Sequence, residues 1–176
     1  MPLPPHPPLS ILIDNLTNSI RHTISGDSQP TVVTALSKAD LPAIRKKQGW
    51  NFAWATEFQQ PDRTVYKLTL AGQPATIQGL VSLSNMAGYY YLHLIESAPI
   101  NLGRMKLYEG VPGNLVAFAC KLAWDAGDEG AVTFQAKTKL ITHYEATLGA
   151  THIGGHRMII YLLAALHLIH RYFPQL

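Results

Sequence analysis

The segment that most constrains the fold of this chain runs from Val111 to Ala126. Its residues are apolar except for Asn114, Lys121 and Asp125. A helix that is apolar around most of its circumference must be covered on several sides, so we expect it at the centre of a domain. Pro112 suits the first turn, where its missing N–H would have no intrahelical partner, and Gly127 offers a left-handed stop after the last turn.

Composition supports one globular domain. Of the 176 residues, 47% are hydrophobic and 14% are charged, a balance that can fill a core and does not suit disorder. The net charge of +3 is too small for a broad nucleic-acid surface. The single cysteine, Cys120, excludes an intrachain disulfide and a zinc ribbon. We read it as a small core residue in a cytoplasmic protein.

No segment of the sequence predicts a membrane anchor. The longest apolar run, Met158 to Leu166, is shorter than the about 20 residues that a membrane-spanning helix needs. The first eight residues contain five prolines and lack the charged and apolar regions of a secretory signal. We therefore expect residues 1–8 to be a disordered, proline-rich tail and the protein to be soluble. Residues 9–30, where Ile11 and Ile13 alternate with other residues, predict a strand or hairpin extension.

Residues 31–176 predict a single α/β domain with an extra C-terminal helix. Strands are expected over 31–36, 65–70, 76–84, 89–95, 131–134 and, as a strand or hairpin, 151–161. Helices are expected over 38–47, 111–126, 137–148 and 162–173. This order joins an antiparallel first half to crossover units in the second half, which favours one mixed sheet with helices on its faces.

Two glycines precede and open the helix over 111–126, in the sequence Tyr-Glu-Gly-Val-Pro-Gly-Asn-Leu. Glycines let the main chain approach a ligand closely, and the amides of a first helical turn favour a negative charge. The candidate donors are the amides of Val111, Gly113, Asn114 and Leu115. Such a short motif is weak by itself, and a tight loop that merely enters a buried helix explains it as well.

Four segments taken together resemble the GNAT superfamily of N-acetyltransferases, over about residues 31–161. Residues 35–44 contain its Leu-x-x-x-Asp-Leu pattern at the first strand-to-helix element. The strand over 92–99 and the glycine loop before Val111 follow in the family's order. Residues 137–150 are similar to the family's Ala-x-x-Leu-Tyr-x-x-x-Gly-Phe helix end.

The resemblance implies a partly splayed, mixed central sheet with helices on both faces, and an acetyl-CoA site between two diverging strands, 92–96 and 131–134. It places the pantetheine arm beside main-chain groups such as those of Ile95 and Ser97. It places the pyrophosphate on the loop and helix that begin at Gly110. The residues that it assigns to binding acetyl-CoA are Ile95, Ser97, Gly110, Val111, Gly113, Asn114, Leu115, Lys137 and Lys139.

Acyl transfer to an amine needs a base, an N–H donor for the carbonyl oxygen and a route for the thiolate to leave. We predict Glu96 as the base and Tyr144 as the acid, with His93 as a further candidate base. Each has an alternative role: Glu96 could cap a loop, Tyr144 could pack in the core, and His93 could be a plain sheet residue. A regular strand would place His93 on the opposite sheet face from Glu96.

The sequence also departs from the family pattern. Leu107 and Pro112 stand where the pyrophosphate loop normally has Arg or Gln and a second glycine, the loop over 99–110 is longer, and Lys137 replaces a common asparagine. A catalytically silent module that binds coenzyme A or a partner protein therefore stays open, as does, more remotely, an acyltransferase of charged transfer RNA. The predicted acceptor is a small-molecule or peptide amine.

Other residues offer weaker functional readings. His152, His156, His167 and His170 have no cysteine or carboxylate at ligand spacing, so we predict no metal site. An aromatic group is expected in the core or in a homodimer contact, with an acceptor pocket as the alternative: Trp50, Phe52, Trp54, Phe58 and Tyr89 to Tyr91.

Overall fold

A seven-stranded mixed sheet organises the computed structural model, which describes residues 6–174. The strand order is β3-β4-β5-β6-β8-β10-β9, and all neighbours are antiparallel except β6 and β8. The strands are β3 (Thr31–Ala35), β4 (Thr64–Leu70), β5 (Gln73–Asn85), β6 (Tyr90–Ser97), β8 (Val132–Gln135), β9 (Thr151–His152) and β10 (Arg157–Ile160). The predicted mixed sheet is confirmed.

Among the described strands of this sheet, the one parallel pair, β6 and β8, is hydrogen-bonded at one end and separated at the other. Tyr90 is opposite Val132 and Tyr91 is opposite Thr133, and no pairing between the two strands follows. The strands then diverge, as the predicted splay requires. In β6 a bulge also places both Leu92 and Leu94 opposite consecutive β5 residues, which leaves His93 as an extra residue.

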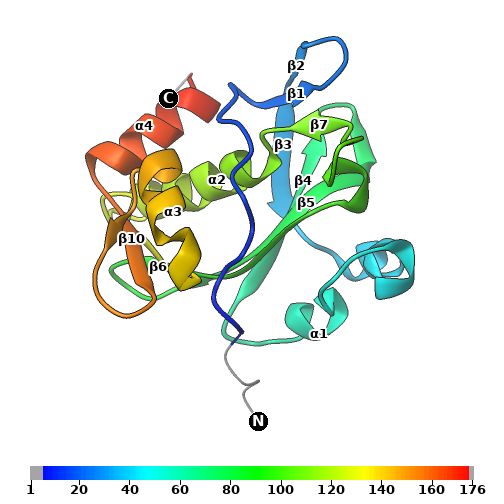
Figure 1. Ribbon diagram of the computed structural model, residues 1–176. Coiled ribbons are helices and arrows are strands. Elements are labelled where there is room, and N and C mark those ends of the chain that lie inside the picture. The colour runs from blue at the N-terminus through cyan, green and yellow to red at the C-terminus, as the bar shows by residue number, and fades with distance from the viewer. Residues whose placement is uncertain (1–5, 175–176) are drawn as a thin grey trace.

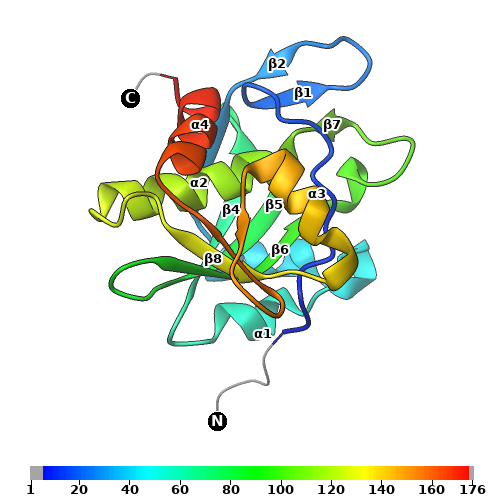
Figure 2. The same ribbon diagram turned by 60° about the vertical axis from the view of Figure 1, so that its left-hand side comes forward.

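Helices cover both faces of the sheet (Figures 1 and 2). One face packs against α2 (Val111–Asp125), with α4 (Leu163–Tyr172) lying on α2 and α3 (Ile141–Leu148) beside it. The other face carries α1 (Trp54–Phe58) and the 3₁₀ helices η1 (Lys38–Ile44) and η2 (Lys46–Gln48). Ten of the residues of α2 are buried, so the predicted central helix is confirmed.

The remaining elements are short. A separate three-stranded sheet has the order β2-β1-β7, formed by β1 (Ile20–His22), β2 (Ser28–Gln29) and β7 (Tyr108–Glu109). Two further 3₁₀ helices are η3 (Pro99–Asn101) and η4 (Thr138–Leu140). Within residues 6–174, no helix has the length and apolar character needed to cross a membrane.

Two predicted elements differ in the structure. The segment over 38–47 is a pair of 3₁₀ helices instead of one α-helix, because Pro42 lies inside it and cannot donate the hydrogen bond of a regular α-helical turn. The aromatic stretch after it, for which no helix or strand is predicted above, contains the short helix α1.

The N-terminal segment, residues 6–17, is extended and bound to the domain, while β1 and β2 form an antiparallel pair within the predicted extension over 9–30. His6 Nε2 lies 2.7 Å from Glu57 Oε2, so the described part of the predicted tail is held in place. Leu9 bridges to the end of β8: its N–H donates to Gln135 O at 2.7 Å, and Lys137 N–H donates to Leu9 O at 3.0 Å. Figure 2 shows this segment, in dark blue, running between β6 and α3. Residues 1–5 of the predicted tail lie outside the described residues.

Candidate functional site

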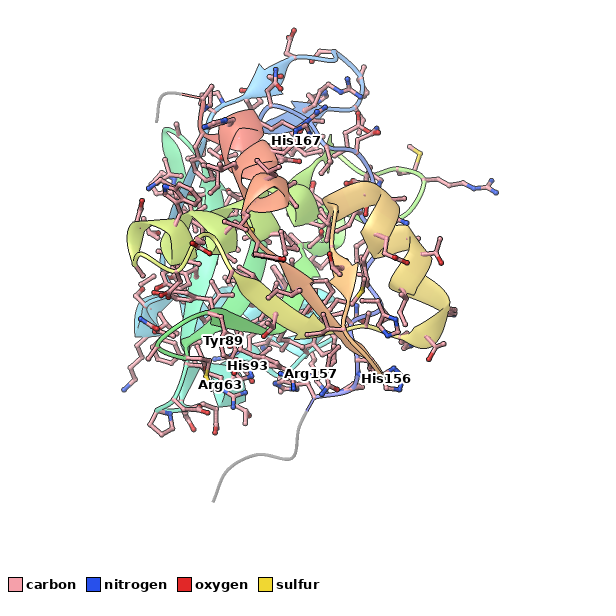
Figure 3. All side chains as sticks on the ribbon, turned by 90° about the vertical axis from the view of Figure 1, so that its left-hand side faces the viewer. Arg63, Tyr89, His93, His156, Arg157 and His167 are labelled. Atoms are coloured by element: carbon pink, nitrogen blue, oxygen red, sulfur yellow. The ribbon has the colours of Figure 1, made fainter. Side chains whose placement is uncertain are left out.

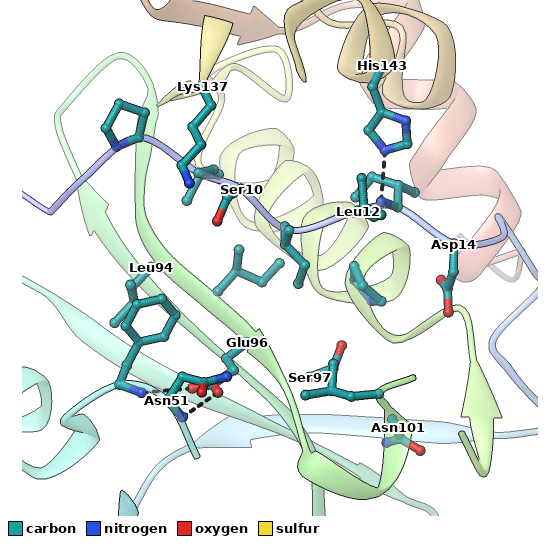
Figure 4. Close-up of a pocket in the computed structure, with 18 of the residues that line it drawn as sticks. Ser10, Leu12, Asp14, Asn51, Leu94, Glu96, Ser97, Asn101, Lys137 and His143 are labelled. Atoms are coloured by element: carbon teal, nitrogen blue, oxygen red, sulfur yellow. Dashed lines mark hydrogen bonds between the residues drawn. The ribbon is translucent and has the colours of Figure 1, made fainter. Parts of the chain in front are cut away.

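A cavity of about 730 Å³ lies beside the half of β6 that has separated from β8 (Figure 4). One wall is the run of β6 from Leu94 to Ser97, and the opposite wall is the N-terminal segment from Pro7 to Asp14. Asn51 and Phe52 close one end with the loop before α1, while Lys106 and Pro112 line the other end near α2. The predicted contacts Ile95, Ser97 and Lys137 all line this cavity.

The main chain of β6 is unpaired on its cavity side. Pairing with β8 ends at Tyr91, and the N-terminal segment bonds to β8 through Leu9, with no described main-chain bond to β6. The N–H and C=O groups of a strand need partners when they are buried. The edge from Leu94 to Ser97 therefore offers main-chain hydrogen bonds to an extended ligand that carries amide groups.

Glu96 lies at this edge as a buried carboxylate with several donors. Its side chain faces α1, and the residue is 4% exposed. Oε2 accepts from Asn51 N at 2.7 Å, and Oε1 accepts from Phe52 N at 3.3 Å and from Trp54 Nε1 at 2.9 Å. A carboxylate has about four acceptor positions, so Oε2 keeps capacity for one more donor. Glu96 also lines the cavity, and Figure 4 shows its bonds to the Asn51 region.

His93 lies on the same sheet face as Glu96, contrary to the expectation from a regular strand. The bulge shifts the alternation of β6 by one residue, and His93 Nε2 lies 2.6 Å from Ser84 Oγ on the face that carries α1. Burial and the nearby charge of Arg63 lower the pKa of His93 to about 4, so its ring is neutral at pH 7. Figure 3 shows His93 beside Arg63, and His93 does not line the cavity.

Tyr144 is buried under the N-terminal segment. Its hydroxyl donates to Ile11 O at 2.6 Å, and its ring meets Phe134 edge to face with centroids 5.5 Å apart. The neighbouring His143 accepts from Ile13 N at 2.9 Å. Burial raises the pKa of Tyr144 well above its usual value. The hydroxyl predicted to act as an acid is therefore committed to a main-chain carbonyl, and Tyr144 does not line the cavity.

The start of α2 is covered instead of forming an open cradle for an anion. Gly110 N–H donates to Asp14 Oδ1 at 3.1 Å, and Asn114 N–H already donates to Gly110 O at 3.0 Å inside the helix. Leu115 follows within the helical ladder, and Val111 and Gly113 are buried. A Cβ atom at Gly113 would collide with the Tyr172 hydroxyl. This packing favours the alternative given above, a tight loop that enters a buried helix.

The two predicted lysines are both exposed but differ in position. Lys137 lies at the end of β8 and lines the cavity, with its side chain drawn in Figure 4 near Ser10. Lys139 is not among the lining residues. Lys106, from the long loop before α2, pairs with Asp14 at 3.1 Å between Nζ and Oδ2.

Comparisons with known proteins agree on the fold. No protein-family model and no curated protein matches the sequence. Among solved structures, AtaTR bound with acetyl-CoA aligns with 79% of this chain and 98% of its own at 16% identity and a TM-score of 0.53. FeeM, an N-acyl amino acid synthase from uncultured soil microbes, aligns with 78% of this chain and 99% of its own, at 15% identity and a TM-score of 0.51.

A chimera of the spermidine N-acetyltransferase SpeG from Vibrio cholerae gives the same result. It aligns with 78% of this chain and 98% of its own, at 14% identity and a TM-score of 0.51. These structures share the mixed sheet flanked by helices that is described above. This chain has the GNAT fold. At these identities the comparison shows the architecture, and the chemistry has to be argued from the residues of the site.

Several features of this GNAT fold had no signal in the sequence. The alternation of Ile11 and Ile13 predicts an extended segment, but nothing in the sequence places that segment in the splay. Trp50 and Trp54 are buried in the core, while Phe52 lines the cavity. The aromatic group therefore serves the core and also contributes to the site.

The histidines and the cysteine have structural surroundings. Within residues 6–174, no group of three or more His, Cys, Asp or Glu side chains is arranged to hold a metal ion. His152 and His156 bond to main-chain carbonyls at Gly155 and Ala136, at 2.7 and 2.9 Å. Figure 3 shows His156 and His167 at separate places in the molecule. Cys120 is buried in the core, and burial raises the pKa of its thiol to about 12, which keeps it protonated.

Proposed function

We propose that this protein is an N-acyltransferase that moves an acyl group, such as acetyl, from a coenzyme A thioester to an amine. The observation that carries the proposal is the cavity along the unpaired edge of β6, at the place where β6 diverges from β8. A pantetheine arm is an extended chain with two amide groups, so it matches the unpaired main chain of Leu94 to Ser97. Two structures of similar fold are AtaTR bound with acetyl-CoA and a chimera of a spermidine N-acetyltransferase.

The chemistry proposed for this site is direct transfer. The amine nitrogen forms a bond to the carbonyl carbon of the thioester, the carbon–sulfur bond breaks, and the thiolate leaves. A main-chain N–H near Ile95 or Ser97 is the proposed donor to the carbonyl oxygen, because these residues line the cavity on an unpaired edge.

Glu96 is the proposed acceptor of the proton that the amine loses. It lines the cavity, and Oε2 accepts only one described hydrogen bond, which leaves room for a water or an amine. The three donors on its two oxygens hold the carboxylate in one orientation. His93 is not proposed as the base, because it lies outside the cavity.

Tyr144 is not proposed as the acid. Its proton is donated to Ile11 O, and burial raises its pKa, so it is a poor proton source in this arrangement. A thiolate is a stable leaving group near neutral pH, since thiols have ordinary pKa values of about 8.5. The proposed transfer therefore proceeds without protonation by Tyr144.

The test combines a binding measurement with a turnover measurement. Acetyl-CoA is expected to raise the melting temperature, and a panel of polyamines, amino acids and peptide amino termini is expected to include an acceptor that drives thiol release. Ser97→Leu, which places a larger side chain in the cavity, should reduce both signals. Ser25→Leu, the same change in an exposed turn, should reduce neither.

Three outcomes separate the candidate functions. Thiol release that depends on an amine and is lost in Ser97→Leu supports the proposal. Binding of acetyl-CoA without release for any acceptor favours the silent module. An absence of both signals in the folded protein would refute a coenzyme A site in this cavity. A panel that includes aminoacyl transfer RNA tests the remaining alternative in the same assay.

A further inference from the structure

The cavity runs along β6 to the start of α2, where Asp14, Lys106 and Pro112 line it. At this end the Asp14 carboxylate binds two groups suited to a phosphate, the Gly110 amide and the Lys106 ammonium, each at 3.1 Å. An incoming pyrophosphate would have to displace a carboxylate of like charge from both donors. Two donors of this region, the Gly110 amide and Lys106, are therefore already used by the protein itself.

The cover over the start of α2 is part of the hydrophobic core. Ile13 and Thr17, on either side of Asp14, are 4% and 7% exposed. Arg171 Nε donates to Leu16 O at 2.8 Å, which ties the same stretch to α4. Because buried side chains and hydrogen bonds fix both ends of this stretch, opening it would disrupt the core.

The surroundings of Gly110 and Gly113 also show that the protein's own atoms pack against the start of α2. Gly113 has the Tyr172 hydroxyl and the Leu16 side chain where a Cβ atom would be, and Gly110 has Thr17 there. The glycines that suggested a phosphate loop thus make room for the protein's own N-terminal segment and α4. Their close approach to other atoms is fully explained by internal packing.

We propose that this site recognises its acyl donor through the pantetheine arm and the acyl group alone, with the nucleotide of coenzyme A outside the binding site. The substrate class is then an acyl-pantetheine thioester, whatever is attached beyond the arm. This inference rests on the proposed function and specifies its donor. It follows from an unpaired strand edge at Leu94 to Ser97 and from donors at the start of α2 that Asp14 already occupies, within one cavity.

The test compares S-acetylpantetheine with acetyl-CoA on the full chain. Dissociation constants from calorimetry are expected to agree within about threefold, because the nucleotide gains no strong contact. Each charge-assisted hydrogen bond to a bound phosphate would shift the ratio by about tenfold or more. Acetyl-CoA binding more than about tenfold tighter than S-acetylpantetheine would overturn the inference.

Asp14→Asn provides a second, independent measurement. Asparagine keeps an oxygen for the Gly110 amide but removes the negative charge, so only binding of the nucleotide should change. If the inference holds, the affinity for S-acetylpantetheine stays the same, and acetyl-CoA binds several-fold more tightly to this variant than to the wild type. Asp27→Asn, an exposed carboxylate in the β1–β2 turn, is the matched control. Equal affinities of the Asp14→Asn and wild-type proteins for acetyl-CoA would count against Asp14 as the barrier.

The two proposals fail in different ways. Equal binding of both thioesters without amine-dependent thiol release leaves this inference standing and refutes the proposed function. Turnover with acetyl-CoA but no binding of S-acetylpantetheine refutes this inference and leaves the proposed function standing. A failure of both thioesters to bind refutes both.

Discussion

Glu96→Gln is the substitution whose consequences follow most directly from the structure. Glutamine has one oxygen and one NH₂ group. In the wild type, Asn51 N lies 2.7 Å from Oε2 of Glu96. If the glutamine oxygen keeps the two donors of Oε1, Phe52 N and Trp54 Nε1, its NH₂ group faces the Asn51 N–H. Two donors then oppose each other in a place where Glu96 is almost fully buried.

The expected cost is large for a change of one atom. Hydrogen bonds to a charged acceptor contribute about 1.5–3 kcal/mol each, and a buried donor left without a partner costs about 1–3 kcal/mol. We expect the free energy of unfolding to fall by about 2–4 kcal/mol. Urea denaturation should show a lower midpoint with an unchanged slope.

Turnover is measured on the folded fraction, so that the effect on chemistry is separated from the effect on stability. If Glu96 accepts the proton, kcat per folded molecule should fall by about 10² or more, with binding of the thioester unchanged. Glu145→Gln, an exposed carboxylate on α3, is the matched control and should change neither quantity. A Glu96→Gln protein that unfolds at the wild-type midpoint would refute the hydrogen-bond reasoning, and wild-type turnover would refute the role as base.

Two further predictions concern buried groups near the site. Because burial lowers the pKa of His93 from 6.5 to about 4, the unfolded chain binds a proton that the folded chain does not, and stability is lost as pH falls from about 6.5 to about 4. The loss of unfolding free energy should approach about 2–3 kcal/mol. In His93→Gln the urea midpoint should change less with pH over this range, and identical pH profiles for the two proteins would contradict the prediction. Tyr144→Phe should lower the free energy of unfolding by about 1 kcal/mol, through the lost bond to Ile11 O, and leave kcat per folded molecule unchanged. A tenfold lower kcat at wild-type stability would instead show that Tyr144 is the acid.

Some of the site was predictable because it depends on local pattern. The apolar run from Val111 indicates a central helix, and the short apolar strands on either side indicate a mixed sheet with a parallel pair. These inferences use burial patterns with a period of two or about 3.6 residues, which a sequence displays directly. The placement of Ile95 and Ser97 beside the pantetheine arm came instead from the resemblance to the GNAT superfamily.

Other parts depend on contacts between residues far apart in the chain. The bulge that turns His93 toward Ser84 comes from the pairing of β5 with β6, and no residue type in β6 marks it. The carboxylate of Asp14 reaches an amide 96 positions away, and the Tyr144 hydroxyl reaches a carbonyl 133 positions away. An extended segment without periodicity has no preferred partner until the domain has folded around it.

The sequence by itself determined most of the main strands and helices and their order, because these follow from residue volume, polarity and backbone preference along a short stretch. Only the tertiary structure decided which groups are free to meet a ligand. A strand edge is open or occupied, and a helix amide is exposed or covered, according to which distant segment packs there. In this protein the N-terminal segment packs against the start of α2 and bonds to the end of β8, and it leaves the edge of β6 unpaired.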